Sequence, residues 1–366
     1  MHPPIHTIYV EDSVRSAPVT RRVLERKSGG AKVEFVADGR EVVRRFEMGR
    51  GAQGRGKRSL LLSDLRAEPI KPCPGTPRSL CCRYEILNFA TGCPLECAYC
   101  ILQDYFSNPL LIVQANSDAF LAAAGETLRA RPDRFFRLGT GEFTDSLALD
   151  PLTDYARLLI EFVRDFPNAV LELKTKTASI EGILGIDHGR RVVCAWSANS
   201  ERVIAEEEFG VASLEERLGA AGRCEAAGYR LAFHFDPIFH YDGWRDDYRR
   251  AVERIFEKIR PESIAWISLG CFRYRPGLER VIRERFPLSS HTYGEFIRGS
   301  DGKMRYPQPL RIEMCRQMMQ WIRAAGGSDV PAYLCMENAQ VWQGAMGRAP
   351  RDSAELGRWL DAACQD

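Results

Sequence analysis

The stretch from Ala90 to Cys100 constrains this chain more than any other, because it holds three cysteines in the spacing C-x3-C-x2-C, at Cys93, Cys97 and Cys100. A loop with this spacing can wrap three thiolates around one small metal–sulfur centre. Three thiolates leave one iron of a four-iron cluster without a protein ligand, and that iron can chelate and reduce a small molecule. The alternative is three buried or zinc-bound cysteines, but zinc usually needs a fourth ligand, and no C-x2-C or H-x3-H partner follows.

The size and charge of the chain leave its partners open. A length of 366 residues is long for one domain, although single α/β barrels with insertions reach it. Lys and Arg number 51 against 49 Asp and Glu, so the net charge of +2 neither supports nor excludes nucleic acid. The first 60 residues are locally basic, which indicates either a binding patch or a solvated surface.

The cysteine content predicts the compartment. There are 12 cysteines, the segment from Met1 to Val10 has no apolar leader region, and no apolar run reaches the length of a membrane span. A reducing compartment follows, in which thiols and cluster ligands are expected rather than disulfides. We therefore expect a cytoplasmic protein without a membrane partner.

From residue 84 onward, short apolar runs alternate with amphipathic stretches, the pattern of β-α units with a parallel sheet. The expected strands are 85–90, 134–139, 168–174, 191–196, 229–235 and 263–269. The expected helices are 99–107 with 118–130, 153–165, 177–184, 200–226, 245–259 and 276–285. Six units are too few for a closed eight-stranded barrel, so the sequence predicts an α/β fold with a partial (β/α)6 TIM-type barrel.

Segments before and after the barrel predict two additions to it. Residues 1–60 read as a small N-terminal α/β appendage, with strands at 8–10 and 32–36 and a helix at 19–27. The barrel with its cluster loop spans 61–285. The extension 286–366 begins with extended runs around Gly299-Ser300-Asp301-Gly302, which predict a β-hairpin. A helix at 309–325, a strand at 331–335 and a helix at 352–363 follow.

In such barrels the chemistry lies at the carboxyl ends of the strands. Polar residues suited to binding a zwitterionic amino acid and a ribose stand at all six predicted strand ends. The candidates are Glu142, Thr144, Lys174, Ser197, Asn199, His234, Asp236 and Cys271. Lys174 can equally form a structural ion pair, and a histidine on a strand is more often a hydrogen-bonded core residue than a ligand.

Two further groups of residues suggest functions. The hairpin carries Arg298, Lys303, Arg305 and Tyr306, and cations beside an aromatic ring suit a phosphate backbone and an extruded base. The alternative is a surface hairpin without a function. Cys73, Cys81 and Cys82 precede the cluster loop. They are either buried thiols, redox or hydrogen-donor thiols near the active site, or a second metal site that lacks a fourth ligand.

The cluster loop, with Tyr99 just before its last cysteine, resembles the signature of the radical S-adenosylmethionine (SAM) superfamily. From about Ile8 to about Trp342 the chain also resembles the spore photoproduct lyase family. The resembling segments are Ile8-Tyr9-Val10, Ala90-Thr91-Gly92-Cys93, Thr144-Asp145 with Asp150, Lys174-Thr175-Lys176, Trp196-Ser197-Ala198-Asn199, His234-Phe235-Asp236-Pro237-Ile238, Ser268-Leu269-Gly270 with Phe272-Arg273, Gly302-Lys303-Met304-Arg305 and Leu334-Cys335-Met336-Glu337.

The resemblance implies a DNA repair lyase with a [4Fe-4S] cluster and SAM as cofactors. A 5′-deoxyadenosyl radical would abstract a hydrogen atom from 5-thyminyl-5,6-dihydrothymine, a UV-induced thymine dimer. The methylene bridge would then break, and a protein hydrogen donor would quench the product radical. Duplex DNA carrying the lesion and a reductase or flavodoxin-type electron donor would be the partners of a monomeric enzyme.

The resemblance also assigns residues. Cys93, Cys97 and Cys100 would ligate the cluster, and Thr144, Lys174 and Ser197 would contact SAM, with Asn199, His234 and Asp236 as further cofactor-site candidates. Tyr99 matches a family tyrosine of hydrogen transfer. The hairpin around Arg305 and Tyr306 matches the element that wedges into the lesion strand.

Two positions depart from the family pattern. The hydrogen-donor cysteine of the family falls at Glu142, and a second family tyrosine falls at Ile101. A carboxyl O–H is a poor hydrogen-atom donor compared with a thiol, so either Cys271, Cys81 or Cys82 replaces the donor, or the substrate has changed. The alternatives are therefore a radical SAM enzyme for another nucleobase or a small molecule, and a non-catalytic DNA-damage-binding protein.

Overall fold

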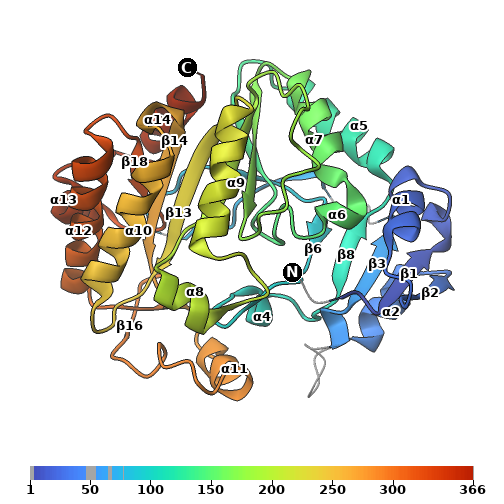
Figure 1. Ribbon diagram of the computed structural model, residues 1–366, viewed down its shortest axis with the longest axis horizontal. Coiled ribbons are helices and arrows are strands. Elements are labelled where there is room, and N and C mark those ends of the chain that lie inside the picture. Colours follow the sequence, from blue (N-terminus) through green and yellow to red (C-terminus); the bar gives the residue numbers. More distant parts are fainter. Residues whose placement is uncertain (1–3, 47–54, 65–67, 77, 366) are drawn as a thin grey trace.

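Two sheets carry the fold in the computed structural model, which describes residues 4–46, 55–64, 68–76 and 78–365 (Figure 1). The first sheet has the strand order β2-β1-β3-β8-β6, and the second has the order β18-β14-β13-β11-β10-β9-β5-β4. In Figure 1 the first sheet lies at the blue, N-terminal end, and the helices α7, α9, α10 and α12 flank the second sheet. No helix in the described ranges is long and apolar enough to cross a membrane.

The second sheet is the predicted partial barrel. Its six expected strands are β5 (Glu85–Leu87), β9 (Phe136–Gly139), β10 (Ala169–Thr175), β11 (Val192–Ser197), β13 (Arg230–Ile238) and β14 (Ile264–Cys271). They are parallel neighbours in chain order, which confirms the prediction. Two strands extend the sheet: β18 (Ala332–Leu334) is parallel to β14, and β4 (Ile70–Pro72) is antiparallel to β5.

Helices cover the sheet with their apolar faces. In α7 (Tyr155–Arg164), for example, Leu159, Ile160 and Val163 are buried, and each such side chain contributes about 1.5–3 kcal/mol to stability. The other helices are α4 (Leu102–Tyr105), α5 (Ser117–Arg129), α6 (Asp150–Thr153), α8 (Glu201–Glu207), α9 (Leu214–Ala226), α10 (Trp244–Lys258), α11 (Leu278–Arg285), α12 (Gln308–Gly326), α13 (Ala339–Met346) and α14 (Ser353–Gln365).

Three expected helices differ from the structure. The one expected at 99–107 is shortened to α4. Residues 177–184 form turns rather than a helix, and the segment leads into Gly185, whose φ of +83° is left-handed. The expected helix at 200–226 is divided into α8 and α9 by β12 (Glu208–Phe209). This short strand pairs with β7 (Glu96–Cys97). The segment that interrupts the helix therefore holds the cysteine loop against the barrel.

The first sheet contains the expected N-terminal elements, which are β1 (Thr7–Glu11), α1 (Pro18–Arg26), β2 (Lys32–Val36) and α2 (Gly39–Arg45). It continues beyond residue 60 through β3 (Ser59–Ser63), β8 (Leu111–Gln114) and β6 (Ala90–Thr91). Its buried side chains, such as Ile8 and Leu60, belong to the same core cluster as Phe136 of the barrel. The division of the chain into three domains stays a prediction.

The predicted hairpin is present. The strands β16 (Ile297–Arg298) and β17 (Met304–Arg305) pair, and β17 also pairs with β15 (Arg273–Tyr274) at the end of the barrel. The turn closes with hydrogen bonds from Gly299 N to Lys303 O (2.7 Å) and from Gly302 N to Gly299 O (2.9 Å). The hairpin is therefore attached to β15, the short strand that follows the barrel strand β14 in the chain.

Candidate active site

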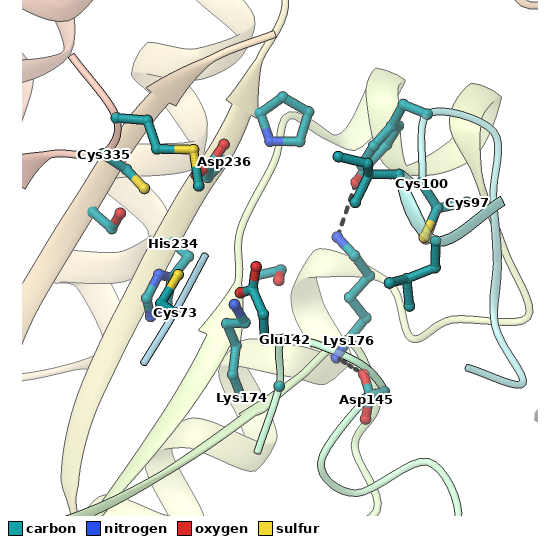
Figure 2. Close-up of a pocket in the computed structure, with 18 of the residues that line it drawn as sticks. Cys73, Cys97, Cys100, Glu142, Asp145, Lys174, Lys176, His234, Asp236 and Cys335 are labelled. Carbon is teal, nitrogen blue, oxygen red and sulfur yellow. Dashed lines mark hydrogen bonds between the residues drawn. The ribbon is translucent and has the colours of Figure 1, made fainter. Parts of the chain in front are cut away.

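A cavity of about 300 Å³ opens at the carboxyl ends of the barrel strands, between those ends and the cysteine loop (Figure 2). Its volume is in the range of small-molecule sites in proteins. Most of the residues predicted from the sequence line it. They are Cys93, Cys97, Tyr99, Cys100, Glu142, Thr144, Lys174, Ser197, His234, Asp236 and Lys303.

The cysteine loop is held in place from several sides. Gln103 Nε2 donates to the carbonyls of Cys97 (3.2 Å) and Ala98 (2.8 Å), and the side chain of Glu96 pairs with Arg285 at 2.7 Å. The amide of Ala98 donates to the carbonyl of Glu207 (2.8 Å), next to the β7–β12 pair. These bonds come from the loop's own helix and from distant segments, so they fix the loop against the barrel.

The donor set of the loop suits an iron–sulfur cluster. All three cysteines line the cavity, whereas no three metal-binding side chains within the described ranges converge as a single ion requires. The protein ligands of a four-iron cluster bind separate irons and therefore stand apart. Three cysteines from one loop match the ligand number of a four-iron cluster with one open iron, whereas a structural zinc site uses four protein ligands.

Tyr99 belongs to a buried network that the sequence did not reveal. Its hydroxyl donates to Glu208 and accepts from Lys176 Nζ at 2.9 Å, and Lys176 also contacts Glu208 at 2.8 Å. Arg217 pairs with the other oxygen of Glu208 at 2.6 Å, with both side chains fully buried. Burial alone would raise the pKa of Glu208, but Lys176 and Arg217 lower it to about 2.

The consequence for Tyr99 is a fixed and protonated phenol. Burial, with Glu208 adding to it, raises the pKa of Tyr99 well above its usual value. Glu208 is thus the common partner of two cations and one phenol, and it connects the cysteine loop to the end of β10.

The strand ends β9 and β10 bring Glu142 and Lys174 to the middle of the cavity wall, as Figure 2 shows. Burial lowers the pKa of Lys174, but the carboxylates of Glu142, Glu172 and Asp236 outweigh burial and raise it. Lys174 is therefore a cation surrounded by acids. Gly141 permits this approach, because a Cβ there would lie 2.7 Å from Lys174 Cβ.

The remaining strand ends supply two more pairs of charged or polar groups. His234 Nε2 lies 2.6 Å from Glu172 Oε1, so His234 lines the cavity and is also a hydrogen-bonded buried histidine. Arg273 forms two hydrogen bonds with the carboxylate of Asp236, at 2.9 and 3.0 Å. Burial would raise the pKa of Asp236, but Arg273 lowers it below its usual value.

Two candidates do not reach the cavity. The Sγ of Cys271 lies 3.8 Å from the Sγ of Cys315 in α12, because alternate residues of a strand face opposite sides and Ser268 of the same strand faces the cavity. Asn199 is buried, with its amide donating to Pro237 O at 3.1 Å and accepting from the hydroxyl of Tyr248. The expectations that Cys271 donates hydrogen and that Asn199 binds a cofactor therefore do not fit the structure.

The four predicted hairpin residues differ in their exposure and position. Arg305 is 5% exposed and is paired with Asp301 at 2.7 Å, and Tyr306 is 5% exposed, with its hydroxyl accepting from His240 N. Neither side chain is accessible to a DNA strand in this arrangement, because these partners lie inside the protein. Arg298 is exposed, and Lys303 reaches the cavity and donates to Thr76 Oγ1 at 2.9 Å.

The structure adds cavity residues that sequence reasoning missed or left unassigned. Cys73, Cys82 and Cys335 place three thiols on the wall, together with Tyr84 and Arg273. Cys81 is the chain neighbour of Cys82 and is half-buried. The strand pairing of β4 with β5 brings Cys73 to this wall, and only the structure shows that pairing.

Comparison with known proteins agrees with this architecture. The family model described as spore photoproduct lyase matches residues 79–308. The spore photoproduct lyases of Geobacillus sp. and Bacillus subtilis are each 29% identical to this chain, over 201 and 203 residues, which are 54% of this chain and 59% of theirs. That of Clostridium acetobutylicum is 23% identical over 233 residues, 63% of this chain and 67% of that protein. The chain thus matches about three-fifths of the length of the first two relatives.

Solved structures extend the likeness in fold. The structure of a spore photoproduct lyase complexed with dinucleoside spore photoproduct has a TM-score of 0.78 at 24% identity, over 91% of this chain and 98% of that one. A variant of the lyase with bound AdoMet and dinucleoside spore photoproduct has the same TM-score, identity and coverage. The likeness in fold therefore covers nine-tenths of this chain.

Proposed function

Because this chain belongs to the spore photoproduct lyase family, as the match over residues 79–308 shows, we propose that it is a radical SAM lyase acting on a methylene-bridged thymine dimer in DNA. One observation carries the proposal: three thiols of a C-x3-C-x2-C loop face a cavity whose opposite wall holds buried charged groups. A related lyase binds AdoMet and dinucleoside spore photoproduct.

The residues of the cavity have distinct parts in this proposal. Cys93, Cys97 and Cys100 would hold a [4Fe-4S] cluster, which together with SAM supplies a carbon-centred radical when bound. Lys174, kept cationic by the surrounding carboxylates, is suited to pair with the carboxylate of SAM. The hydroxyls of Thr144 and Ser197 line the same space and can complete its hydrogen bonds.

Substrate binding would use the rim and the wall opposite the cluster loop. Arg298 is exposed on the hairpin, and Lys303 of the same hairpin lines the cavity, so the two cations lead from the surface inward. Cations placed this way contact phosphates and position a nucleic acid without reading its sequence. A damaged base pair costs little to open, so an extruded lesion can enter the cavity.

The test is an anaerobic turnover assay with reconstituted protein, SAM, a reductant and an oligonucleotide that carries the spore photoproduct. Liquid chromatography with mass detection would follow thymine and 5′-deoxyadenosine, with an undamaged oligonucleotide as the control. Return of two thymines per lesion supports the proposal. Release of 5′-deoxyadenosine without repair would contradict it and would assign another substrate to the cavity.

A second candidate has a specific observation in its favour. Glu142 stands in the cavity wall beside Lys174, where an acceptor and a donor lie together. Such a pair suits the edge of a different nucleobase or a small molecule, as a radical SAM enzyme with another substrate would need. A non-catalytic damage-binding protein would neither retain iron nor bind SAM. The flavodoxin-type or reductase electron donor, the monomeric state and the cytoplasmic location stay predictions.

A further inference from the structure

Three aromatic rings pack together beside the cavity and form what we call the aromatic platform. Tyr105 and Phe106 come from the end of α4, and Phe143 comes from the loop after β9. The ring of Tyr105 stacks on that of Phe143, with centroids 5.6 Å apart and 21° between the planes. Phe106 meets these two rings edge to face, at 5.2 and 5.7 Å. Both are arrangements that aromatic pairs prefer, so they fix the plane of the Tyr105 ring.

The platform lies at the rim of the cavity, as its chain neighbours show. Glu142 and Thr144, on either side of Phe143, line the cavity. Ile101 lines it too and lies one turn before Tyr105, whose amide donates to the carbonyl of Ile101 at 3.0 Å. Residues four apart share one face of a helical turn. Ile101 and Tyr105 therefore form an apolar strip that leads from the cavity to the surface.

This strip is open to solvent and has a cation beside it. Ile101 is 37% exposed and Tyr105 is 42% exposed. Since Phe143 covers one face of the Tyr105 ring, the exposed part is directed away from Phe143. Asp104 pairs at 3.6 Å with Arg275, whose side chain is half exposed. A guanidinium has five N–H donors, so Arg275 can bind a phosphate next to the ring as well as Asp104.

An exposed aromatic face with a cation beside it suits a strand of nucleic acid whose bases are unpaired. Every base has a π face, so stacking on an aromatic ring tolerates any sequence, and cations along the strand bind its phosphates. A lesion that leaves the stack also leaves the next base of its strand without a stacking partner on that side. The ring of Tyr105 can replace that partner at the point where the strand enters the cavity.

We propose that Tyr105 stacks on the nucleobase next to the lesion in the same strand, an inference that rests on the proposed lyase function. The lesion occupies the cavity, the neighbouring base lies on the open face of the ring, and Arg275 contacts the phosphate between or beside them. Tyr105 is a positioning residue in this arrangement, since it touches the strand but not the reacting atoms. The protein should therefore bind a strand that carries the lesion more tightly than the lesion alone.

The experiment measures binding to anaerobically reconstituted protein with SAM and without reductant, so that no turnover occurs. The ligands are dinucleoside spore photoproduct, which has no neighbouring base, and a single-stranded oligonucleotide that carries the same lesion. Tyr105→Ala should weaken the affinity for the oligonucleotide by about 5- to 140-fold and leave the affinity for the dinucleoside unchanged. Tyr105→Phe should bind both ligands as the wild type does, because stacking uses the ring and not the hydroxyl.

Phe35→Ala is the matched control. Phe35 is also an exposed aromatic residue, with the guanidinium of Arg15 4.0 Å from its ring centre. It lies on β2, the edge strand of the first sheet, which is far from α4 in Figure 1. The change should alter neither affinity. In Tyr105→Ala, unchanged affinity for the oligonucleotide would overturn the inference, and so would an equal loss for both ligands, which would make the ring a structural support of the cavity.

Fluorescence reports the stacking directly. Two lesion oligonucleotides carry 2-aminopurine on one or the other side of the lesion, and stacking on an aromatic ring quenches this base. The wild type should quench it on one side, and Tyr105→Ala should not. If the wild type neither prefers the lesion strand to an undamaged strand nor returns thymine in the turnover assay, the lyase function fails. In that case equal affinity of wild type and Tyr105→Ala for the undamaged strand overturns the inference too, whereas a loss in Tyr105→Ala supports stacking without a lesion.

Discussion

Replacing Glu208 by Gln tests the network that holds Tyr99. The carboxylate of Glu208 is fully buried between Lys176 and Arg217, at 2.8 and 2.6 Å. Its pKa lies at about 2, against 4.5 for an ordinary glutamate. At about 1.36 kcal/mol per pKa unit, this difference corresponds to about 3 kcal/mol of stability. Removal of one partner from a buried ion pair typically lowers stability by about 3–5 kcal/mol, which agrees with this value.

The sign of the pH dependence follows from the lowered pKa. Because the carboxyl has a lower pKa in the folded protein, its contribution is complete above pH 4.5 and is lost as the pH falls toward about 2. The stability difference between wild type and Glu208→Gln should therefore be about 3 kcal/mol at neutral pH. It should shrink steadily below pH 4.5, because a protonated glutamate resembles glutamine.

The assay is urea denaturation of both proteins at several pH values, followed by circular dichroism. Glu206→Gln is the control, because Glu206 has a 53% exposed side chain paired with Arg202 and should cost at most about 1 kcal/mol. A difference for Glu208→Gln below that of the control at neutral pH would refute the reasoning. A difference that does not change between neutral and acid pH would refute it as well.

Three further results are expected. Gly139→Ala should lower the free energy of unfolding by about 1–3 kcal/mol, because its Cβ would lie 1.6 Å from the Tyr84 hydroxyl. Gly219→Ala is the control and should not destabilise the protein, because no atom lies within 4 Å of a Cβ built there. Equal urea midpoints for the two variants would contradict this prediction. Arg298→Gln should reduce the slope of log affinity for duplex DNA against log salt by about 0.9, and an unchanged slope would remove Arg298 from the DNA contacts. Cys100→Ala should not retain iron after reconstitution, as a colorimetric iron determination would show; iron content equal to the wild type would exclude it as a ligand.

The barrel could be predicted because its determinants are local. Each of the six strands is a short apolar run, and chain order alone places consecutive β-α units side by side. The helix expected at 200–226 was wrong because β12 pairs with β7, about a hundred residues away, and no local pattern records that pairing. Local periodicity therefore predicts elements well, whereas a distant partner decides where an element is interrupted.

The same distinction between local pattern and distant partner applies to the site. The cysteine loop and the strand-end residues Thr144 and Lys174 followed from spacing and position, and they line the cavity. The direction of Cys271 depends on strand phase at the end of β14, and the burial of Arg305 depends on Asp301 and Glu337 as partners. Cys73 reaches the cavity through the antiparallel edge strand β4, which the repeating parallel pattern did not include.

The position of β3 has a consequence for how this fold can change in evolution. β3 lies between β1 and β8, and Leu60, Leu61 and Leu62 are fully buried there. Loss of the segment before residue 59 would turn this apolar strand into an open edge, which readily pairs with other chains and aggregates. The N-terminal unit is therefore not an exchangeable module. A relative that lacks it would need another strand, or charged residues along β3, to remain a separate molecule.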